Sequence, residues 1–285
     1  MIRLTVIGLL LCLLSACGTG EFFIKRGING LQDDVADQFK GYANFDESQE
    51  QRIDRIAEQL DAWVRIERLH ILAIELDRMA GDIQSDARLS RETWQSTLSF
   101  LEQPINLASQ DELIREIALV VDSMTDQQAE DTLEKLQQDY SETQKDEAKE
   151  TLEKRNKKLT RGIKIVFSDL GISRSRAQIK EAKKILARRQ SDTELEHQAS
   201  ANNYATFVNL IENRQRESFL DDFQRAWAVA ERGPKERSPE RWQNNTEIIF
   251  EVLNYLLSDL DQDQREIASA KVRRYATLFR SFSES

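Results

Sequence analysis

Apolar residues recur at steps of three and four along most of this chain, which is the period of an amphipathic α-helix. After Asp46 this spacing is kept by Ile53, Ile56, Leu60, Trp63 and Ile74. The same pattern extends over residues 125–167 and 191–232. Each of the three stretches predicts a helix of roughly 60 Å if it is unbroken. Two shorter helices are predicted over residues 239–257 and 262–281.

Helix start signals mark the same stretches. A residue that caps the first turn, with Glu or Gln three places later, satisfies N–H groups that have no partner inside the helix. Such pairs are Asp46–Gln49, Ser109–Glu112, Thr125–Gln128, Ser191–Glu194 and Asp261–Gln264, and Ser238 stands before a proline. Stop signals are Gly81, Pro104, Gly171 and Gly233–Pro234. The openings at residues 45–49, 124–128 and 260–264 are alike, which fits either independent helix starts or an old duplication or shared functional motif.

Turn-forming residues are scarce, with three prolines and ten glycines in 285 residues. A β-rich fold needs many more of them. Charged residues make up 32% of the chain and hydrophobic residues 40%, which suits long amphipathic helices rather than disorder. We therefore expect an all-α fold, an elongated antiparallel helical bundle of about nine helices, some of them very long.

The first 17 residues have the pattern of a targeting segment. Arg3 precedes a short apolar run that ends in Leu14-Ser15-Ala16-Cys17. One positive charge, an apolar stretch too short to span a bilayer and small residues before the cut are typical of a bacterial secretory signal. The last four residues resemble the lipobox of bacterial lipoproteins, in which the cysteine is lipidated and becomes the N-terminus. We expect removal of residues 1–16, a lipidated N-terminus and tether over 17–30, and a helical periplasmic domain over 31–285. This domain either forms a single unit or divides into two lobes near 168–192.

Cysteine use agrees with this interpretation, because the chain has only Cys12, in the apolar run, and Cys17. The mature chain would then have no internal disulfide, no thiol nucleophile and no thiolate metal site. The resemblance implies three acyl chains, palmitate among them, on Cys17. Bacterial lipoproteins that stay at the inner membrane usually have an aspartate directly after the lipidated cysteine, whereas this chain has Gly18. The expected location is therefore the periplasmic face of the bacterial outer membrane.

Several motifs resemble a family of uncharacterised, all-helical proteobacterial lipoproteins, a domain of unknown function. The likeness covers an aromatic segment after the lipobox, an acidic helix start with Gln, Trp, Arg and Glu, a Thr-x-x-Gln start leading to an Arg-Asn pair, and a second such start near the C-terminus. The matching residues are Phe22, Phe23, Phe39, Tyr42, Asp46, Gln49, Trp63, Arg65, Glu67, Thr125, Gln128, Arg155, Asn156, Asp261 and Gln264. The chain departs from the family at His70, where proline is common. A weaker likeness joins the Thr-x-x-Gln start to periplasmic chaperones of the CpxP and Spy type.

Charge is segregated along the chain. The formal net charge is −10, which disfavours nucleic acid as a partner. Residues 154–189 nevertheless carry 13 basic and two acidic residues, directly after an acidic stretch over 126–153. Either the two stretches pair with each other, or the basic one forms a ridge that docks on an anionic envelope component or a protein partner. The candidate docking residues are Lys154, Arg155, Lys157, Lys158, Arg161, Lys180, Lys183, Lys184, Arg188 and Arg189.

Catalytic motifs are absent from the sequence. It has no Gly-rich phosphate loop and no G-x-S-x-G elbow. Glu67–His70 and Glu194–His197 have the spacing of a di-iron site in a helical bundle, which makes a metal-dependent oxidase a distant alternative. We expect instead a non-enzymatic protein without cofactor or metal, with a binding or scaffolding role in the cell envelope. A holdase-like periplasmic chaperone is the first alternative, and it requires an exposed apolar concave face.

Overall fold

A computed structural model describes residues 20–86, 88–102, 111–232 and 234–284 of the chain, and this part contains helices and loops but no strand. The all-α prediction is confirmed. The helices are α2 (Gly20–Asn29), α3 (Leu31–Lys40), α4 (Glu47–Trp63), η1 (Val64–Leu69), α5 (His70–Asp86), α6 (Arg91–Glu102), α7 (Asp111–Asp122), α8 (Asp126–Glu147), α9 (Leu152–Asp169), α10 (Arg176–Leu186), α11 (Thr193–Glu212), α12 (Phe219–Ala230), α13 (Pro234–Arg237), α14 (Pro239–Leu257) and α15 (Gln262–Ser283). Because α4, η1 and α5 are continuous, the described residues hold thirteen separate helices, more than the nine that we predicted.

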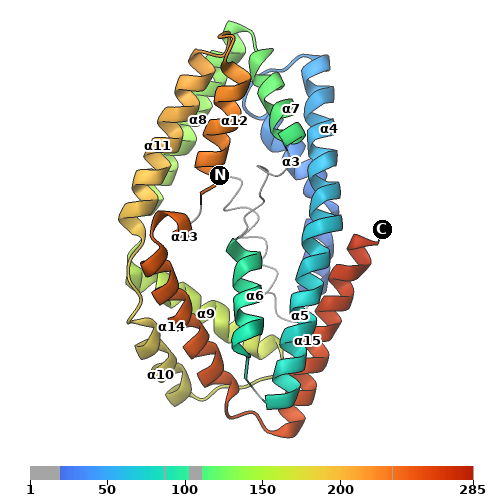
Figure 1. The fold of residues 1–285 in the computed structure, drawn as a ribbon, viewed down its shortest axis with the longest axis vertical. Coiled ribbons are helices and arrows are strands. Elements are labelled where there is room, and N and C mark those ends of the chain that lie inside the picture. The colour runs from blue at the N-terminus through green and yellow to red at the C-terminus, as the bar shows by residue number, and fades with distance from the viewer. Residues whose placement is uncertain (1–19, 87, 103–110, 233, 285) are drawn as a thin grey trace.

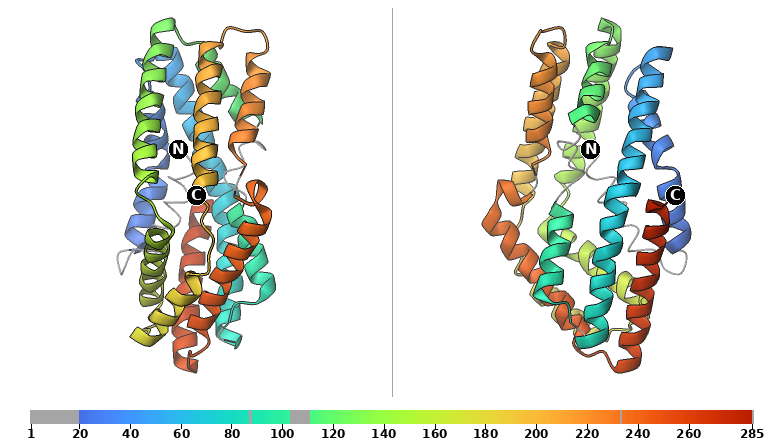
Figure 2. Two further views of the ribbon diagram at one scale, coloured as in Figure 1. Left: turned by 90° about the vertical axis from the view of Figure 1, so that its left-hand side faces the viewer. Right: turned by 45° about the vertical axis from the view of Figure 1, so that its right-hand side comes forward.

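The molecule is elongated, and most of its longer helices run roughly along the long axis (Figure 1). The continuous helix α4–η1–α5 forms one long side, with α15 packed against its lower half. Helices α8 and α11 form the upper part of the opposite side, and α10 and α14 form its lower part (Figures 1 and 2). Contacts therefore join segments far apart in sequence, α5 with α15 and α8 with α11, which lie on either side of residues 168–192.

Two of the three long predicted helices are broken. The stretch over 125–167 divides into α8 and α9, because the Thr151 side chain accepts a hydrogen bond from the Lys154 amide at 3.2 Å and starts a new helix. The stretch over 191–232 divides into α11 and α12. There the buried Arg214 donates hydrogen bonds to the carbonyls of Met124 and Ile211 and pairs with Asp126, which fixes the intervening loop.

The third long helix is unbroken, but its apolar face changes register. It runs from Glu47 to Asp86 and passes Gly81 without stopping, so the predicted stop there is wrong. The buried positions Val64 and Leu69 lie five residues apart, and the π-helical segment η1 accommodates this wider spacing. Ile74, predicted to share the buried face, is instead 37% exposed, because the π turn moves burial to Ala73 and Leu76.

Among the described helices, the most extensive contact joins α5 and α15. Ala73, Ala80, Ala268 and Ala276 are fully buried, and the Ser269 hydroxyl donates to the carbonyl of Ala80 at 2.9 Å. Such small side chains let two helix backbones approach closely, and larger neighbours such as Phe279 fill the remaining space.

The start signals of α4 and α8 meet in space. Asp46 caps α4 with Gln49 as its reciprocal partner, and Thr125 caps α8 with Gln128 in the same way. The two glutamine side chains also bond each other: Gln49 Nε2 donates to Gln128 Oε1 at 3.2 Å, and Gln128 Nε2 donates to Gln49 Oε1 at 2.7 Å. Gln128 Nε2 further donates to the Asn44 carbonyl at 2.8 Å. Two of the three similar openings therefore form one interlocked pair, with both glutamines buried.

The other predicted signals divide as follows. Asp261–Gln264 is a capping box, and Pro239 occupies the first turn of α14. Ser191–Glu194 is not a capping box, because α11 begins after Asp192 without a side-chain cap. A capping box that we did not predict, Ser175–Gln178, starts α10. Gly171 ends α9 with a φ of 79°, whereas Ser109, Pro104 and Gly233 lie outside the described residues.

The segment predicted as a tether is partly folded. Its residues from Gly20 onward form α2, in which Ile24 and Ile28 are almost fully buried. Cys17 and the predicted signal lie outside the described residues. The packed part of the chain thus begins within a few residues of the cysteine.

Candidate anionic docking surface

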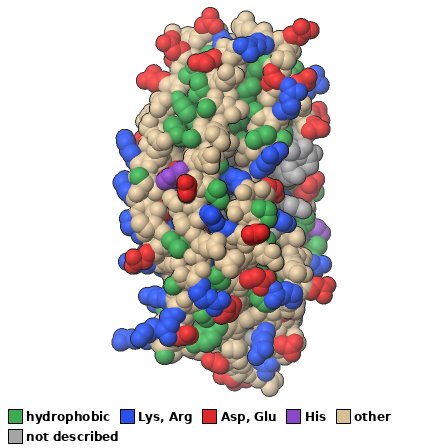
Figure 3. Space-filling model, turned by 60° about the vertical axis from the view of Figure 1, so that its left-hand side comes forward, with side chains coloured by type: hydrophobic (Ala, Val, Ile, Leu, Met, Phe, Trp, Pro, Cys, Tyr) green, Lys and Arg blue, Asp and Glu red, His purple; other side chains and the backbone are tan. Residues whose placement is uncertain are grey.

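Exposed cations form one row on each of two neighbouring helices. On α9 the row is Lys157, Arg161 and Lys164, and on α10 it is Arg176, Lys180 and Lys183. Both rows have the spacing i, i+4, i+7, which places their members on one face of a helix. All six side chains are exposed, and none has an ion pair with another side chain in the described part of the chain. Lys and Arg side chains gather accordingly at the lower left of Figure 3, the end of the molecule where α10 lies.

Each row stands apart from the buried face of its helix. The face of α9 that packs into the core is formed by Thr160, Ile163 and Phe167. Ile179, Ala182 and Leu186 do the same for α10, and α9 and α10 also contact each other. Core packing on one face thereby holds the basic rows toward solvent on another.

The remaining predicted docking residues have partners within the chain, most of them at its surface. Lys158 pairs with Glu150 at 2.9 Å, Lys184 with Glu181 at 2.6 Å and Arg188 with Glu251 at 2.8 Å. Lys154 donates to the carbonyl of Lys149. Arg155 and Arg189 are half-buried, and they contact Glu196 and Asn156 respectively.

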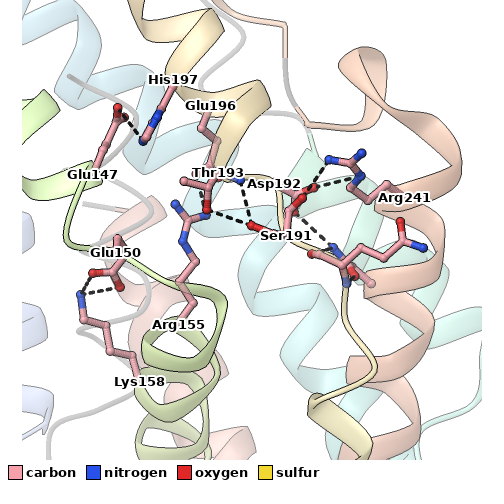
Figure 4. A network of polar contacts seen from close by, with 12 residues as sticks. Glu147, Glu150, Arg155, Lys158, Ser191, Asp192, Thr193, Glu196, His197 and Arg241 are labelled. Carbon is pink, nitrogen blue, oxygen red and sulfur yellow. Dashed lines mark hydrogen bonds and ion pairs between the residues drawn. The ribbon is translucent and has the colours of Figure 1, made fainter.

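The adjacent residues Arg155 and Asn156 connect three helices. Arg155 reaches Glu196 of α11 at 2.5 Å (Figure 4). Asn156 donates to the Leu186 carbonyl at the end of α10 at 2.9 Å and accepts from Arg189 at 3.0 Å. The Arg-Asn pair singled out in the sequence is therefore a junction between α9, α10 and α11.

The linker before α11 is held from α14. Asn245 is buried; its Oδ1 accepts from the Gln190 amide at 2.8 Å, and its Nδ2 donates to the Gln190 carbonyl at 3.0 Å. Arg241 donates to the Ser191 carbonyl at 2.8 Å, and its Nε lies 4.0 Å from Asp192 (Figure 4). These contacts fix the position of α10 and hence of its basic row.

The second histidine of the chain, His197 of α11, contacts the end of α8. His197 Nε2 lies 3.5 Å from Glu147 Oε2 (Figure 4). Burial raises the pKa of the Glu147 carboxyl, while His197 and Arg155 act in the opposite direction. Burial also lowers the pKa of the guanidinium groups of Arg174 and Arg189.

The acidic stretch 126–153 does not neutralise the basic stretch 154–189. Glu150–Lys158 is the one ion pair that joins them, and both stretches lie within the described residues. The other ion-paired acids of this stretch point elsewhere: Asp126 to Arg214, Asp139 to Lys135, Asp146 to Lys149 and Glu147 to His197. The positive charge of the two basic rows is therefore not neutralised by ion pairs with the acidic stretch.

The two Glu-x-x-His pairs do not converge. Glu67 accepts a hydrogen bond from Trp63 Nε1 at 2.8 Å, and His70 is exposed. Glu194 is exposed, and His197 faces Glu147 rather than the first pair. In the part of the chain that the structure describes, no three His, Cys, Asp or Glu side chains are grouped as a metal would require.

Lys164 and Arg176 complete the two rows, although the predicted docking set omitted them. Their signal was the helical spacing to Lys157 and Lys180, which a count of charges along the chain does not use. Among the described helices, none combines the length and the apolar character needed to cross a bilayer. No protein-family model, no curated protein and no solved structure matches this chain.

Proposed function

We propose that this chain is a bacterial lipoprotein, anchored in the outer membrane through lipid on Cys17, whose elongated helical bundle docks on anionic material of the cell envelope. Its role is binding or scaffolding and involves no catalysis. The sequence Leu14 to Cys17 supports the anchor. The observation that carries the docking role is the pair of exposed basic rows on α9 and α10, which lack ion-pair partners in the described chain.

The physical argument rests on the net charge of the molecule. A chain with a formal charge of −10 is repelled by an anionic surface as a whole. Six cations without an ion-pair partner among the described residues, on two adjacent helices, create a local field of the opposite sign, which selects both the partner and the face presented to it. Lys158 and Lys184, in contrast, have carboxylates within ion-pair distance.

The holdase alternative has less support. It requires a contiguous exposed apolar face. The large apolar side chains exposed in the described residues are Ile66, Ile71, Ile74, Val229 and Ile267. Three of them lie along η1 and α5, and the other two are on α12 and α15. A metal-dependent oxidase has no geometric support, because the two Glu-x-x-His pairs face different partners.

Two variants test the proposal. Cys17→Ser should leave the protein out of the membrane fraction after a salt wash, and continued sedimentation with membranes would refute the anchor. In the Cys17→Ser background, Gln at all six row positions should abolish salt-sensitive binding to vesicles containing phosphatidylglycerol or lipopolysaccharide. The melting temperature should stay the same, because the six side chains have no ion-pair partner in the part of the chain that the structure describes. A lower melting temperature with unchanged binding would refute the docking role.

A further inference from the structure

The position of α9 relative to the anchor limits what its basic row can meet. Helix α2, dark blue, and helix α9, yellow-green, lie on the same side of the molecule. This side faces away from the viewer in Figure 1 and forms the left-hand edge in the left panel of Figure 2. The orange and red helices α12 to α14 lie on the other side in that panel.

The chain between the expected lipid and α2 is short. Cys17 precedes Gly20, the first residue of α2, by three positions. An extended chain covers at most about 3.6 Å per residue, so lipid on Cys17 would keep Gly20 within roughly 11 Å of the attachment point. The side of the molecule that carries α2 is then the side nearest the membrane.

Charge on that side favours contact with anionic head groups at one end. Lys25 and Arg26 of α2 are exposed, as are Lys157, Arg161 and Lys164 of α9. Helix α8, on the same side but in the upper half, exposes the carboxylates Glu130, Glu134 and Glu142 instead. An anionic surface would attract the lower half of this side and repel the upper half.

We infer that the α9 row binds the anionic phospholipid head groups of the same membrane that holds the Cys17 lipid, and so sets the orientation of the domain. This inference rests on the proposed anchor. The α2 and α9 side faces the bilayer, with α9 against the head groups and the acidic α8 directed away. The α10 row, at the lower end of the molecule, stays available to a second partner.

The energetics suit a surface contact of this kind. Each basic residue near an anionic bilayer strengthens association by roughly fivefold, so the three residues of the α9 row contribute on the order of 100-fold. The row has long, flexible side chains on an exposed helix face, which fits a flat layer of head groups better than a shaped ligand. One acid, Glu153, is also exposed on this face, four residues before Lys157. Because the lipid already confines the protein to the surface, this contribution goes mainly into orientation.

A single-cysteine label can measure this orientation. The mature chain has no thiol besides Cys17, which lipidation removes from reaction, so Ser168→Cys on α9 and Gln138→Cys on α8 each provide one labelling site. Both positions are exposed. The lipidated full-length protein carries a fluorophore at one site, in phosphatidylcholine vesicles with or without phosphatidylglycerol, and a nitroxide head-group lipid quenches it. We expect strong quenching at position 168 and weak quenching at 138, only when phosphatidylglycerol is present.

Charge variants provide the matched comparison. Lys157→Glu, Arg161→Glu and Lys164→Glu together should remove the quenching at position 168. The matched control is the same change to Glu at Arg55, Arg115 and Arg216, which are exposed on other elements, and it should leave the quenching at position 168 unchanged. Failure of the lipidated protein to sediment with phosphatidylcholine vesicles would refute the anchor itself. Normal sedimentation with no excess of quenching at 168, or with equal quenching in both vesicle types, would overturn only the orientation.

Discussion

The interlocked glutamines of α4 and α8 give a sharp test of how two helix starts are joined. In Gln128→Glu, the carboxylate can still accept from the Thr125 amide, as a capping box requires. It can no longer donate to the Asn44 carbonyl or to Gln49 Oε1, which Gln128 Nε2 reaches at 2.8 Å and 2.7 Å. An acceptor left unsatisfied in a buried site costs about 1–3 kcal/mol. Since Gln49 Oε1 keeps a second donor, the Asp46 amide, we expect a loss of about 2–4 kcal/mol in the free energy of unfolding.

Urea denaturation with fluorescence detection measures this loss, and Gln264→Glu is the matched control. Gln264 occupies the same place in the capping box of α15, but among the described residues its side-chain amide bonds the Asp261 backbone alone, so Glu should be tolerated there within about 0.5 kcal/mol. The deficit of Gln128→Glu should also shrink as the pH falls, because protonation restores one donor and the buried carboxyl binds that proton more tightly in the folded state. Equal stability of the two variants at neutral pH would show that the α4–α8 contact contributes nothing beyond two separate caps.

Two further changes test packing and buried charge. Ala80→Leu should destabilise the protein by about 1–3 kcal/mol or more, since the fully buried Ala80 lies between α5 and α15; the neighbouring Gly81→Ala, where an added Cβ meets nothing within 4 Å, should stabilise it by about 0.5–1 kcal/mol in the same thermal melts. Because burial raises the pKa of Glu147, the folded state binds that proton more tightly than the unfolded state, and this carboxyl reduces stability as the pH rises through its raised pKa. Glu147→Gln should therefore be at least as stable as the parent at pH 7 and lose that advantage near pH 4, and a large loss of stability at pH 7 would show instead that the contact with His197 dominates.

The last two long helices could be predicted from the sequence almost residue by residue, because a proline marks the start of α14 and a capping box the start of α15. The predicted range 239–257 is α14, and 262–281 differs from α15 only at its end. The breaks after Glu147 and Glu212 were missed because neither depends on proline or glycine. Thr151 starts α9 without a Glu or Gln three residues later, and the loop after α11 is fixed by Arg214 through contacts with the distant Met124 and Asp126.

The candidate site was predictable to the level of helix faces. The rows at 157, 161, 164 and at 176, 180, 183 follow from helical spacing alone. Which of the other cations become structural could not be predicted in this way, because their partners come from other segments, as Glu196 does for Arg155 and Glu251 for Arg188. The five-residue gap between Val64 and Leu69 was a visible sign of the π turn, and it accounts for the exposed Ile74.

The wall made by α8 and α11 differs in one respect from the rest of the fold. Most of its length, residues 133–147 of α8 and 193–209 of α11, contains no fully buried side chain. Tyr140 and Tyr204 stack there with ring centroids 4.3 Å apart, but both rings stay partly exposed. Because this helix pair buries so little apolar surface, we expect local unfolding to begin there while α5 and α15 stay packed together.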